Sequence, residues 1–278
     1  MQIQLAKTYS PARNYGVSSW WASPKMDGIR ALFTLDKGLV SRTQKTIFVG
    51  FQQIEAVCVA MVAAAGEPIL IDGELFIPGE AFDVASGIIR DRKGYDPTQK
   101  ARVQFHVFGI YKASGWVDTQ EMDNAIASLT PNQPFVIPVP YAFIENDPVV
   151  IQERKEIFSP ISREGIMLRH PQLAYVQNRT DALLKVKRFE SAIFQVSQIH
   201  QGSGRLRGSM GKLTITGEFQ GLPVESNVGT GFADIQRQEI WDNQRQFLGK
   251  SARIIFMGLS SGSKPTKSLR ISVFKEFV

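Results

Sequence analysis

The chain has 278 residues, of which 43% are hydrophobic, and this is enough for one large or two modest domains, each with its own core. No apolar run is long enough to span a membrane and no signal-peptide pattern is visible, so we expect a cytoplasmic protein without membrane contact. The single cysteine excludes an internal disulfide and a four-cysteine zinc site. The net charge of +6 favours a polyanionic partner, and residues 190–278 hold eleven basic against seven acidic side chains.

The first two-thirds of the chain mixes strand and helix patterns. Because crossover helices do not regularly separate the strands, we predict an α+β domain with antiparallel sheets over residues 1–189. The predicted strands are 31–35, 39–42, 69–77 with a hinge at Gly73, 103–111, 165–169 and 182–187, and the predicted helices are 53–65, 119–129 and 150–158.

The pattern changes near Glu190, where short strands with glycine-rich turns begin. Strands are predicted over 194–200, 211–216, 252–257 and 269–274, and one helix over 233–247. Short strands with a single helix in about 90 residues are typical of a small all-β barrel of the oligonucleotide-binding kind, the OB-fold. We therefore predict a second domain over residues 190–278.

The strongest chemical signal is the segment 25–30, which reads Lys-Met-Asp-Gly-Ile-Arg. A lysine that acts as a nucleophile must lose its proton, so it needs a neighbouring cation or a dry pocket. The turn glycine, Gly28, allows a close approach of the backbone to a ligand, and Arg30 can bind a phosphate or a hydroxyl. Alone, the segment also fits a surface hairpin with a charged turn.

Carboxylates and lysines spaced two apart form further candidate sites. Asp72 and Glu74 share one face of a predicted strand, as do Lys185 and Lys187. Two ammonium groups on one face repel each other, so an anion bound between them is one explanation, and two solvated lysines are the other. Glu164, which we place on a strand, is a plausible Mg²⁺ ligand or a surface carboxylate.

Segment 25–30 resembles the first motif of the covalent nucleotidyltransferases, which comprise DNA ligases, RNA ligases and mRNA capping enzymes. Segment 228–237 resembles part of the ligase OB-fold domain, which favours an ATP-dependent DNA ligase. The resemblance covers nearly the whole chain. Five further segments resemble superfamily motifs in the same order: Ser-Arg-Thr at 41–43, Asp-Gly-Glu at 72–74, Phe-His-Val-Phe at 105–108, Glu-Gly-Ile-Met-Leu at 164–168 and Leu-Lys-Val-Lys at 184–187.

This resemblance implies that Lys25 attacks the α-phosphate of ATP and carries AMP covalently. It implies that Phe108 stacks on adenine and that Glu74 and Glu164 hold Mg²⁺ or Mn²⁺. Arg270 would orient the pyrophosphate in the first step. The catalytic residues implied are Lys25, Asp27, Arg30, Lys185, Lys187 and Arg270, and the nucleotide-binding residues are Lys25, Glu74, Phe108, Lys185 and Lys187.

The implied substrate is nicked double-stranded DNA, bound by a monomer. Arg42 would bind the 5′-phosphate of the broken strand, and Arg179 would lie near the AMP phosphate. A basic loop in the C-terminal domain offers further phosphate contacts, although a solvated loop fits it as well. The DNA-binding residues expected are Arg42, Arg179, Arg205, Arg207 and Lys212.

Three departures from the superfamily pattern stand out. Gly109 follows the aromatic segment where an acidic residue is usual, and Gln44 follows the Ser-Arg-Thr segment where glycine is common. Residues 269–272 read Leu-Arg-Ile-Ser where an Arg-Phe-Pro core is usual.

Other members of the superfamily fit less well. A capping guanylyltransferase usually has tryptophan between the two lysines of the last-quoted motif, and here valine occupies that position. An RNA ligase would rarely carry the 228–237 segment, and an NAD-dependent DNA ligase needs a cysteine zinc site. A catalytically inactive nucleic-acid-binding protein remains the alternative from another class.

Overall fold

The computed structural model describes residues 3–91, 96–130, 132, 134–161, 164–260 and 264–278. The chain divides into two compact units, residues 1–187 and 188–278. No helix within the described ranges is both long and apolar enough to cross a membrane. Each unit is treated separately below.

The first sheet of the first unit has the strand order β1-β10-β9-β2-β8. All neighbours are antiparallel except β1 and β10. Its core surrounds the fully buried Trp20 and includes Ile166, Leu168 and Leu184. The elements are β1 (Leu5–Thr8), β2 (Ser19–Pro24), β8 (Ala142–Glu145), α5 (Pro148–Ile157), β9 (Gly165–Arg169) and β10 (Arg179–Lys187).

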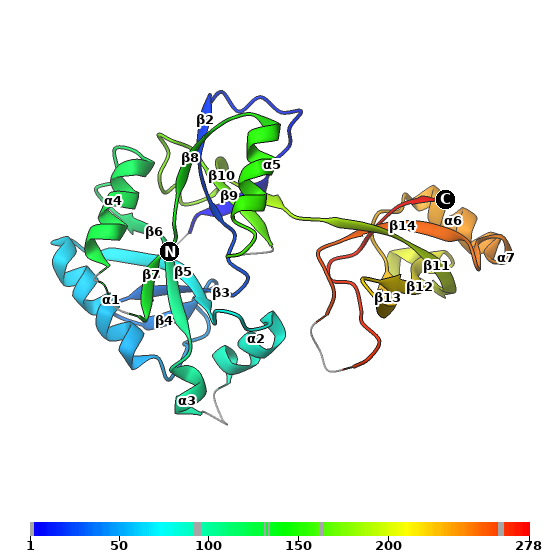
Figure 1. The fold of residues 1–278 in the computed structure, drawn as a ribbon, viewed down its shortest axis with the longest axis horizontal. Helices are drawn as coiled ribbons and strands as arrows, with labels where there is room; N and C mark the ends of the chain where they lie inside the picture. The colour runs from blue at the N-terminus through cyan, green and yellow to red at the C-terminus, as the bar shows by residue number, and fades with distance from the viewer. Residues whose placement is uncertain (1–2, 92–95, 131, 133, 162–163, 261–263) are drawn as a thin grey trace. The chain divides into compact units, whose positions relative to one another are not determined.

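The second sheet of this unit has the order β4-β3-β5-β6-β7. Its larger core packs the sheet against α1 and α4, and Figure 1 shows both helices beside the sheet. The elements are β3 (Ile29–Thr34), β4 (Gly38–Ser41), α1 (Gln52–Ala65), β5 (Ile69–Phe76), α2 (Phe82–Arg90), α3 (Pro97–Lys100), β6 (Gln104–Lys112), α4 (Thr119–Leu129) and β7 (Val136–Pro138).

The second unit is one antiparallel sheet with the order β13-β12-β11-β14-β15. A parallel bridge between Val224 and Lys267 joins β13 to the segment before β15, so the sheet curls toward a closed barrel. The elements are β11 (Glu190–Gln201), η1 (Gly204–Leu206), β12 (Met210–Phe219), β13 (Leu222–Val228), α6 (Asp234–Asp242), α7 (Gln244–Phe247), β14 (Ser251–Phe256) and β15 (Val273–Phe277).

Several predicted elements differ from those observed. The strand at 69–77 has no hinge at Gly73, because the irregularity lies in its partner β6. The last strand begins at Val273 rather than Leu269, because Ile271 has a left-handed φ of 49° that interrupts the extended chain. The predicted helix at 233–247 is two helices that meet at Asn243. Strands β1, β2, β7, β8 and β13 and helices α2 and α3 were not predicted from the sequence.

Candidate active site

The backbone of Lys25 is held at one end of the first sheet. Lys25 directly follows β2, and its N–H donates to the carbonyl of Gly165 at 2.9 Å. Strand β9 is antiparallel to both β2 and β10, so the end of β2, the start of β9 and the end of β10 coincide. This topology brings Lys25, Glu164 and Lys187 to the same end of the sheet.

The side chain of Lys25 forms an ion pair with Glu164. Both side chains are largely shielded, with 22% and 14% of their surfaces exposed. Glu164 lies in the turn before β9 rather than on a strand as we had predicted. The turn places its carboxylate beside the amine.

Gly28 allows the chain after Lys25 to approach the second sheet. A Cβ atom at this position would lie 2.3 Å from the carbonyl oxygen of Leu75 and 2.9 Å from Cγ of Glu74. Such contacts are sterically forbidden, so any larger residue would push β3 away from β5. The glycine therefore allows a close approach to a neighbouring strand, and it also lines a wider groove beside the site.

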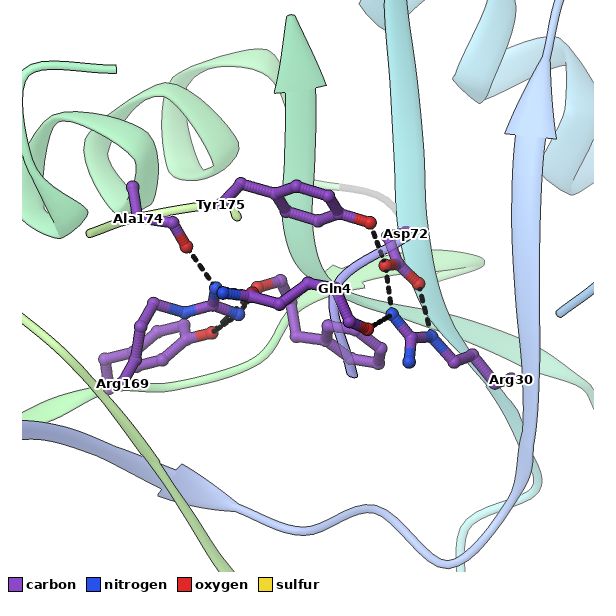
Figure 2. Close-up of polar contacts among 8 residues, drawn as sticks. Gln4, Arg30, Asp72, Arg169, Ala174 and Tyr175 are labelled. Carbon is purple, nitrogen blue, oxygen red and sulfur yellow. Dashed lines mark hydrogen bonds and ion pairs between the residues drawn. The ribbon is translucent and has the colours of Figure 1, made fainter. Parts of the chain in front are cut away.

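Arg30 is fixed by a buried carboxylate. Its Nε donates to Oδ1 of Asp72 at 2.9 Å, and its Nη2 donates to Oδ2 of Asp72 at 2.5 Å and to the carbonyl of Gln4 at 2.8 Å. The hydroxyl of Tyr175 donates to Oδ2 of Asp72 at 2.5 Å, as Figure 2 shows. Burial alone would lower the pKa of Arg30, but Asp72 raises it above its ordinary value, so the guanidinium stays charged.

Phe108 occupies a bulge in β6. Asp72 is opposite Gly109 while Gly73 is opposite Val107, so Phe108 is an extra residue in the pairing of β5 with β6. The guanidinium carbon of Arg30 lies 5.4 Å from the centroid of its ring. The backbone carbonyl of Phe108 accepts hydrogen bonds from the hydroxyl of Tyr141 at 2.8 Å and from Nη2 of Arg169 at 3.0 Å.

These groups surround a cavity of about 280 Å³ in the first unit. Asp27, Glu164 and Lys187 are half-buried and do not contribute to its lining. Seven residues expected from the sequence line it: Lys25, Arg30, Arg42, Glu74, Phe108, Arg179 and Lys185.

A wider groove of about 560 Å³ shares part of this lining. Arg30, Arg42 and Glu74 border both concavities. Ser41, Thr43 and the exposed Arg90 at the end of α2 add polar groups to the groove. Both concavities therefore present cationic and hydroxyl donors suited to phosphate oxygens.

The electrostatics of the cavity favour an anionic ligand. Burial lowers the pKa of Lys185, and the nearby charges of Lys187, Arg179 and Lys25 lower it further. Burial raises the pKa of Glu74 to about 8, Glu164 and Asp72 add to the rise, and Lys25 and Arg30 oppose it. A bound phosphate would relieve the repulsion among these cations.

Glu74 and Glu164 are close enough for their charges to interact. No group of three or more histidine, cysteine or acidic residues suited to a metal is found in the described part of the chain. Mg²⁺ is usually held by one or two carboxylates together with substrate phosphates. This pair of carboxylates therefore fits a metal that arrives with a nucleotide.

The remaining predicted residues lie in the second unit. Arg205, Arg207 and Lys212 are exposed, and Arg205 forms an exposed ion pair with Asp234 at 2.6 Å. The N–H of Arg270 donates to the carbonyl of Gly258 at 2.9 Å, and its side chain is half-buried.

Sequence reasoning missed Tyr141, Arg169 and Tyr175, which hold Phe108 and Asp72. Only Arg169 carried a usable signal, because an arginine that ends an apolar strand segment, Gly-Ile-Met-Leu-Arg, needs buried acceptors. The two tyrosines lie outside the quoted motifs. Arg90 was also missed, although it ends an amphipathic helix.

Lys25 at a strand end, a second lysine, Lys185, and the bulged Phe108 line one cavity. This is the arrangement that the superfamily resemblance led us to expect of a nucleotidyltransferase domain. A family model described as "ATP dependent DNA ligase domain" matches residues 3–187, and the chain belongs to this family. The chain is thus an ATP-dependent DNA ligase by sequence and fold, as the superfamily resemblance led us to expect.

Individual relatives agree with this assignment. A DNA ligase of Haemophilus influenzae is 24% identical over 273 residues, covering 95% of this chain and 88% of the relative. A structure from a study of DNA binding by Lig E DNA ligases, described there as a minimal scaffold, is 27% identical with a TM-score of 0.76, covering 100% of this chain and 99% of the other.

A third comparison bears on the fold. The ATP-dependent DNA ligase of bacteriophage T7 in complex with ATP is 16% identical with a TM-score of 0.57, covering 100% of this chain and 98% of the other. The predicted architecture, an α+β nucleotidyltransferase domain followed by an OB-fold, is confirmed by these neighbours.

Proposed function

We propose that this ligase seals nicks in duplex DNA in three steps, with Lys25 as the nucleophile. The amine attacks the α-phosphate of ATP, forming a phosphoramidate with AMP and releasing pyrophosphate. AMP then passes to the 5′-phosphate of the nick and frees the lysine. Finally the 3′-hydroxyl attacks that phosphate, forms the phosphodiester and releases AMP.

The observation that carries this proposal is the position of Lys25 in the cavity. Lys25 lines this cavity together with Lys185, Arg179 and Phe108. The two cations suit the α-phosphate, and the aromatic ring suits a purine. Asp27, Lys187 and Arg270 keep the catalytic roles that the superfamily resemblance implies. The cavity thus provides groups for both ends of AMP.

Glu74 and Glu164 would hold the divalent metal, Mg²⁺ or Mn²⁺. When bound with ATP, such a metal neutralises phosphate charge. Before that, the contact of Glu164 with Lys25 keeps the amine at the end of β9. Glu164 thereby positions the amine, and both carboxylates would position the nucleotide phosphates through the metal.

The DNA ends would lie along the groove that adjoins the cavity. Arg42 borders both concavities and is placed to bind the 5′-phosphate that receives AMP, and Arg90 is placed to bind the adjoining backbone. In the second unit, Arg205, Arg207 and Lys212 would bind phosphates of the duplex. We propose that the protein acts as a monomer.

The test is covalent labelling with ATP or GTP carrying a radioactive α-phosphate. We expect the wild-type protein to form an AMP adduct and to seal a nicked duplex. Lys25→Ala should form no adduct, because no other amine occupies this position, but it should seal a nick whose 5′ end already carries AMP. Lys37→Ala is the matched control, because this exposed lysine lies in the turn between β3 and β4.

Two outcomes would contradict the proposal. An AMP adduct in Lys25→Ala would show that another residue is the nucleophile. A GMP adduct, or transfer of the nucleotide to RNA alone, would assign the chain to a capping enzyme or an RNA ligase instead.

A further inference from the structure

We propose that Arg169 and Tyr141 are positioning residues for ATP, which act by fixing the bulged residue Phe108 through its carbonyl oxygen. This inference rests on the proposed function, in which the Phe108 ring stacks on adenine. Neither residue needs to contact the reacting phosphate. Their effect should therefore be larger on ATP binding than on phosphodiester formation.

A bulge alone does not fix a side chain. The extra residue lies outside the regular ladder, so its orientation depends on contacts other than strand pairing. At Phe108 these contacts come from two side-chain donors on one carbonyl, the hydroxyl of Tyr141 at 2.8 Å and Nη2 of Arg169 at 3.0 Å. Arg169 also donates to the Tyr141 oxygen at 3.4 Å, so the donors form one connected group.

Both donors come from the first sheet, whereas Phe108 belongs to the second. Arg169 ends β9, and Tyr141 immediately precedes β8. The hydrogen bonds therefore join the two sheets whose residues line the cavity. Strand pairing does not connect the two sheets. These side-chain hydrogen bonds therefore help to set the distance between the Phe108 ring and the residues that would bind the nucleotide phosphates.

Arg169 is itself held rigidly. Only 2% of it is exposed, and its Nη1 donates to the side-chain oxygen of Gln4 and to the carbonyl of Ala174, as Figure 2 shows. Burial raises the pKa of Tyr141, so its hydroxyl keeps its proton and remains a donor at neutral pH.

The neighbouring Gly109 supports the same arrangement. A Cβ atom there would lie 3.0 Å from the ring of Tyr175, which covers this position and bonds Asp72. Asp72 in turn holds Arg30, whose guanidinium contacts the Phe108 ring. Gly109, found where the superfamily usually has an acidic residue, therefore makes room for Tyr175. Through Asp72, Tyr175 helps to hold Arg30 against the Phe108 ring.

The test measures AMP-adduct formation against ATP concentration in single turnover. Tyr141→Phe keeps the ring and removes one donor, so the ATP concentration at half-maximal rate should rise about fivefold, as expected for one hydrogen bond. Arg169→Met should raise it by about tenfold or more, and Arg169→Lys should restore part of the loss. Sealing of a pre-adenylated nick should be affected less in all three variants, because its AMP is already attached to the DNA.

A double-mutant cycle separates positioning from general structural damage. If Tyr141 acts through Phe108, then Tyr141→Phe should have no further effect on ATP in a Phe108→Leu background. Tyr15→Phe, which removes a phenol oxygen that accepts from the Ser10 N–H, is the matched control and should leave ATP dependence unchanged.

An unchanged ATP dependence in Tyr141→Phe, an additive effect in the Phe108→Leu background, or an equal loss of pre-adenylated nick sealing would each overturn the inference. If Arg169→Met does not fold, Tyr141→Phe alone decides the question. Failure of the wild-type protein to form any AMP adduct would instead overturn the proposed function itself, so the two failures are distinguishable.

Discussion

At the scale of single residues, the contact between Lys25 and Glu164 dominates the site. The two side chains of this ion pair are 22% and 14% exposed. Glu74 and Lys185 are close enough to interact electrostatically with both Lys25 and Glu164. Charges at this depth interact more strongly than surface pairs because water screens them less. Substitutions here should therefore change chemistry more than folding.

Glu164→Ala is expected to slow adenylation by on the order of 100-fold or more, because it removes both a proposed metal ligand and the partner of the amine. Folding should be nearly unchanged, since Glu164 lies in a turn and not in a core. Labelling with ATP and circular dichroism measure the two effects. Glu145→Ala, at an exposed strand end, is the matched control. Loss of secondary structure in Glu164→Ala would indicate a structural carboxylate instead.

At the scale of elements, the pairing of β5 with β6 combines the bulge with a half-buried histidine, His106. His106 lies opposite Glu74, its Nε2 bonds Oε1 of Gln104 at 2.9 Å, and its ring meets Phe76 edge-on at 5.4 Å between centroids. Burial lowers the pKa of His106 to about 4. The folded state therefore disfavours the charged imidazole.

This shift predicts a pH dependence of stability. The unfolded chain binds a proton at His106 below about pH 6.5 and the folded chain only below about pH 4, so the contribution of His106 to stability should fall as the pH falls through this window. At His106 this contribution should lower the free energy of unfolding at pH 5, relative to pH 8, by on the order of 2 kcal/mol, whereas the raised pKa of Glu74 acts in the opposite direction.

Urea unfolding followed by tryptophan fluorescence at the two pH values measures this effect. Three of the four tryptophans, Trp20, Trp21 and Trp116, report on the first unit. His106→Asn should remove this contribution, so the stability of the variant relative to the wild type should be higher at pH 5 than at pH 8 by on the order of 2 kcal/mol. An identical difference in wild type and variant would assign the pH dependence to other groups.

At the scale of the whole molecule, basic charge is concentrated toward the C-terminus. The second unit carries most of the excess, and its sheet presents Lys212 near the basic loop that contains Arg205 and Arg207. Arg205 already has an exposed partner in Asp234, which is a weak contact that DNA phosphate can replace.

Replacing Arg205, Arg207 and Lys212 together by alanine is expected to weaken the salt dependence of nick binding. Each phosphate contact contributes about −0.9 to the slope of log affinity against log salt concentration. The slope of the variant should therefore be less negative than that of the wild type by roughly two to three units. Adenylation of Lys25 should be nearly unaffected. The measurement is nick affinity from low to moderate salt, beside the rate of AMP-adduct formation.

A variant with Arg245, Lys264 and Lys275 replaced by alanine removes the same charge from other exposed positions of the second unit. An equal loss of slope in both variants would show that net charge, rather than this loop, governs binding. A parallel loss of adenylation would contradict the division of roles between the two units.

The sequence by itself predicted the family to which this protein belongs. Motif residues such as Lys25, Glu164 and Lys185 are local signals, because the superfamily resemblance assigns each a proposed role from short sequence segments. Strand periodicity and turn glycines likewise indicated an α+β part followed by a barrel. The weakest predictions were at irregular positions, such as Ile271 and Asn243, where one backbone angle changes the element.

Only the tertiary structure decided which side chains support the motif residues. The bonds from Tyr141 and Arg169 to Phe108 join residues 33 and 61 positions apart, and no local pattern specifies such partners. The same holds for Gly28, whose neighbour is the Leu75 carbonyl. Spacing within a strand reveals which side chains share a face, but contacts between strands depend on register, bulges and the packing of one sheet against another.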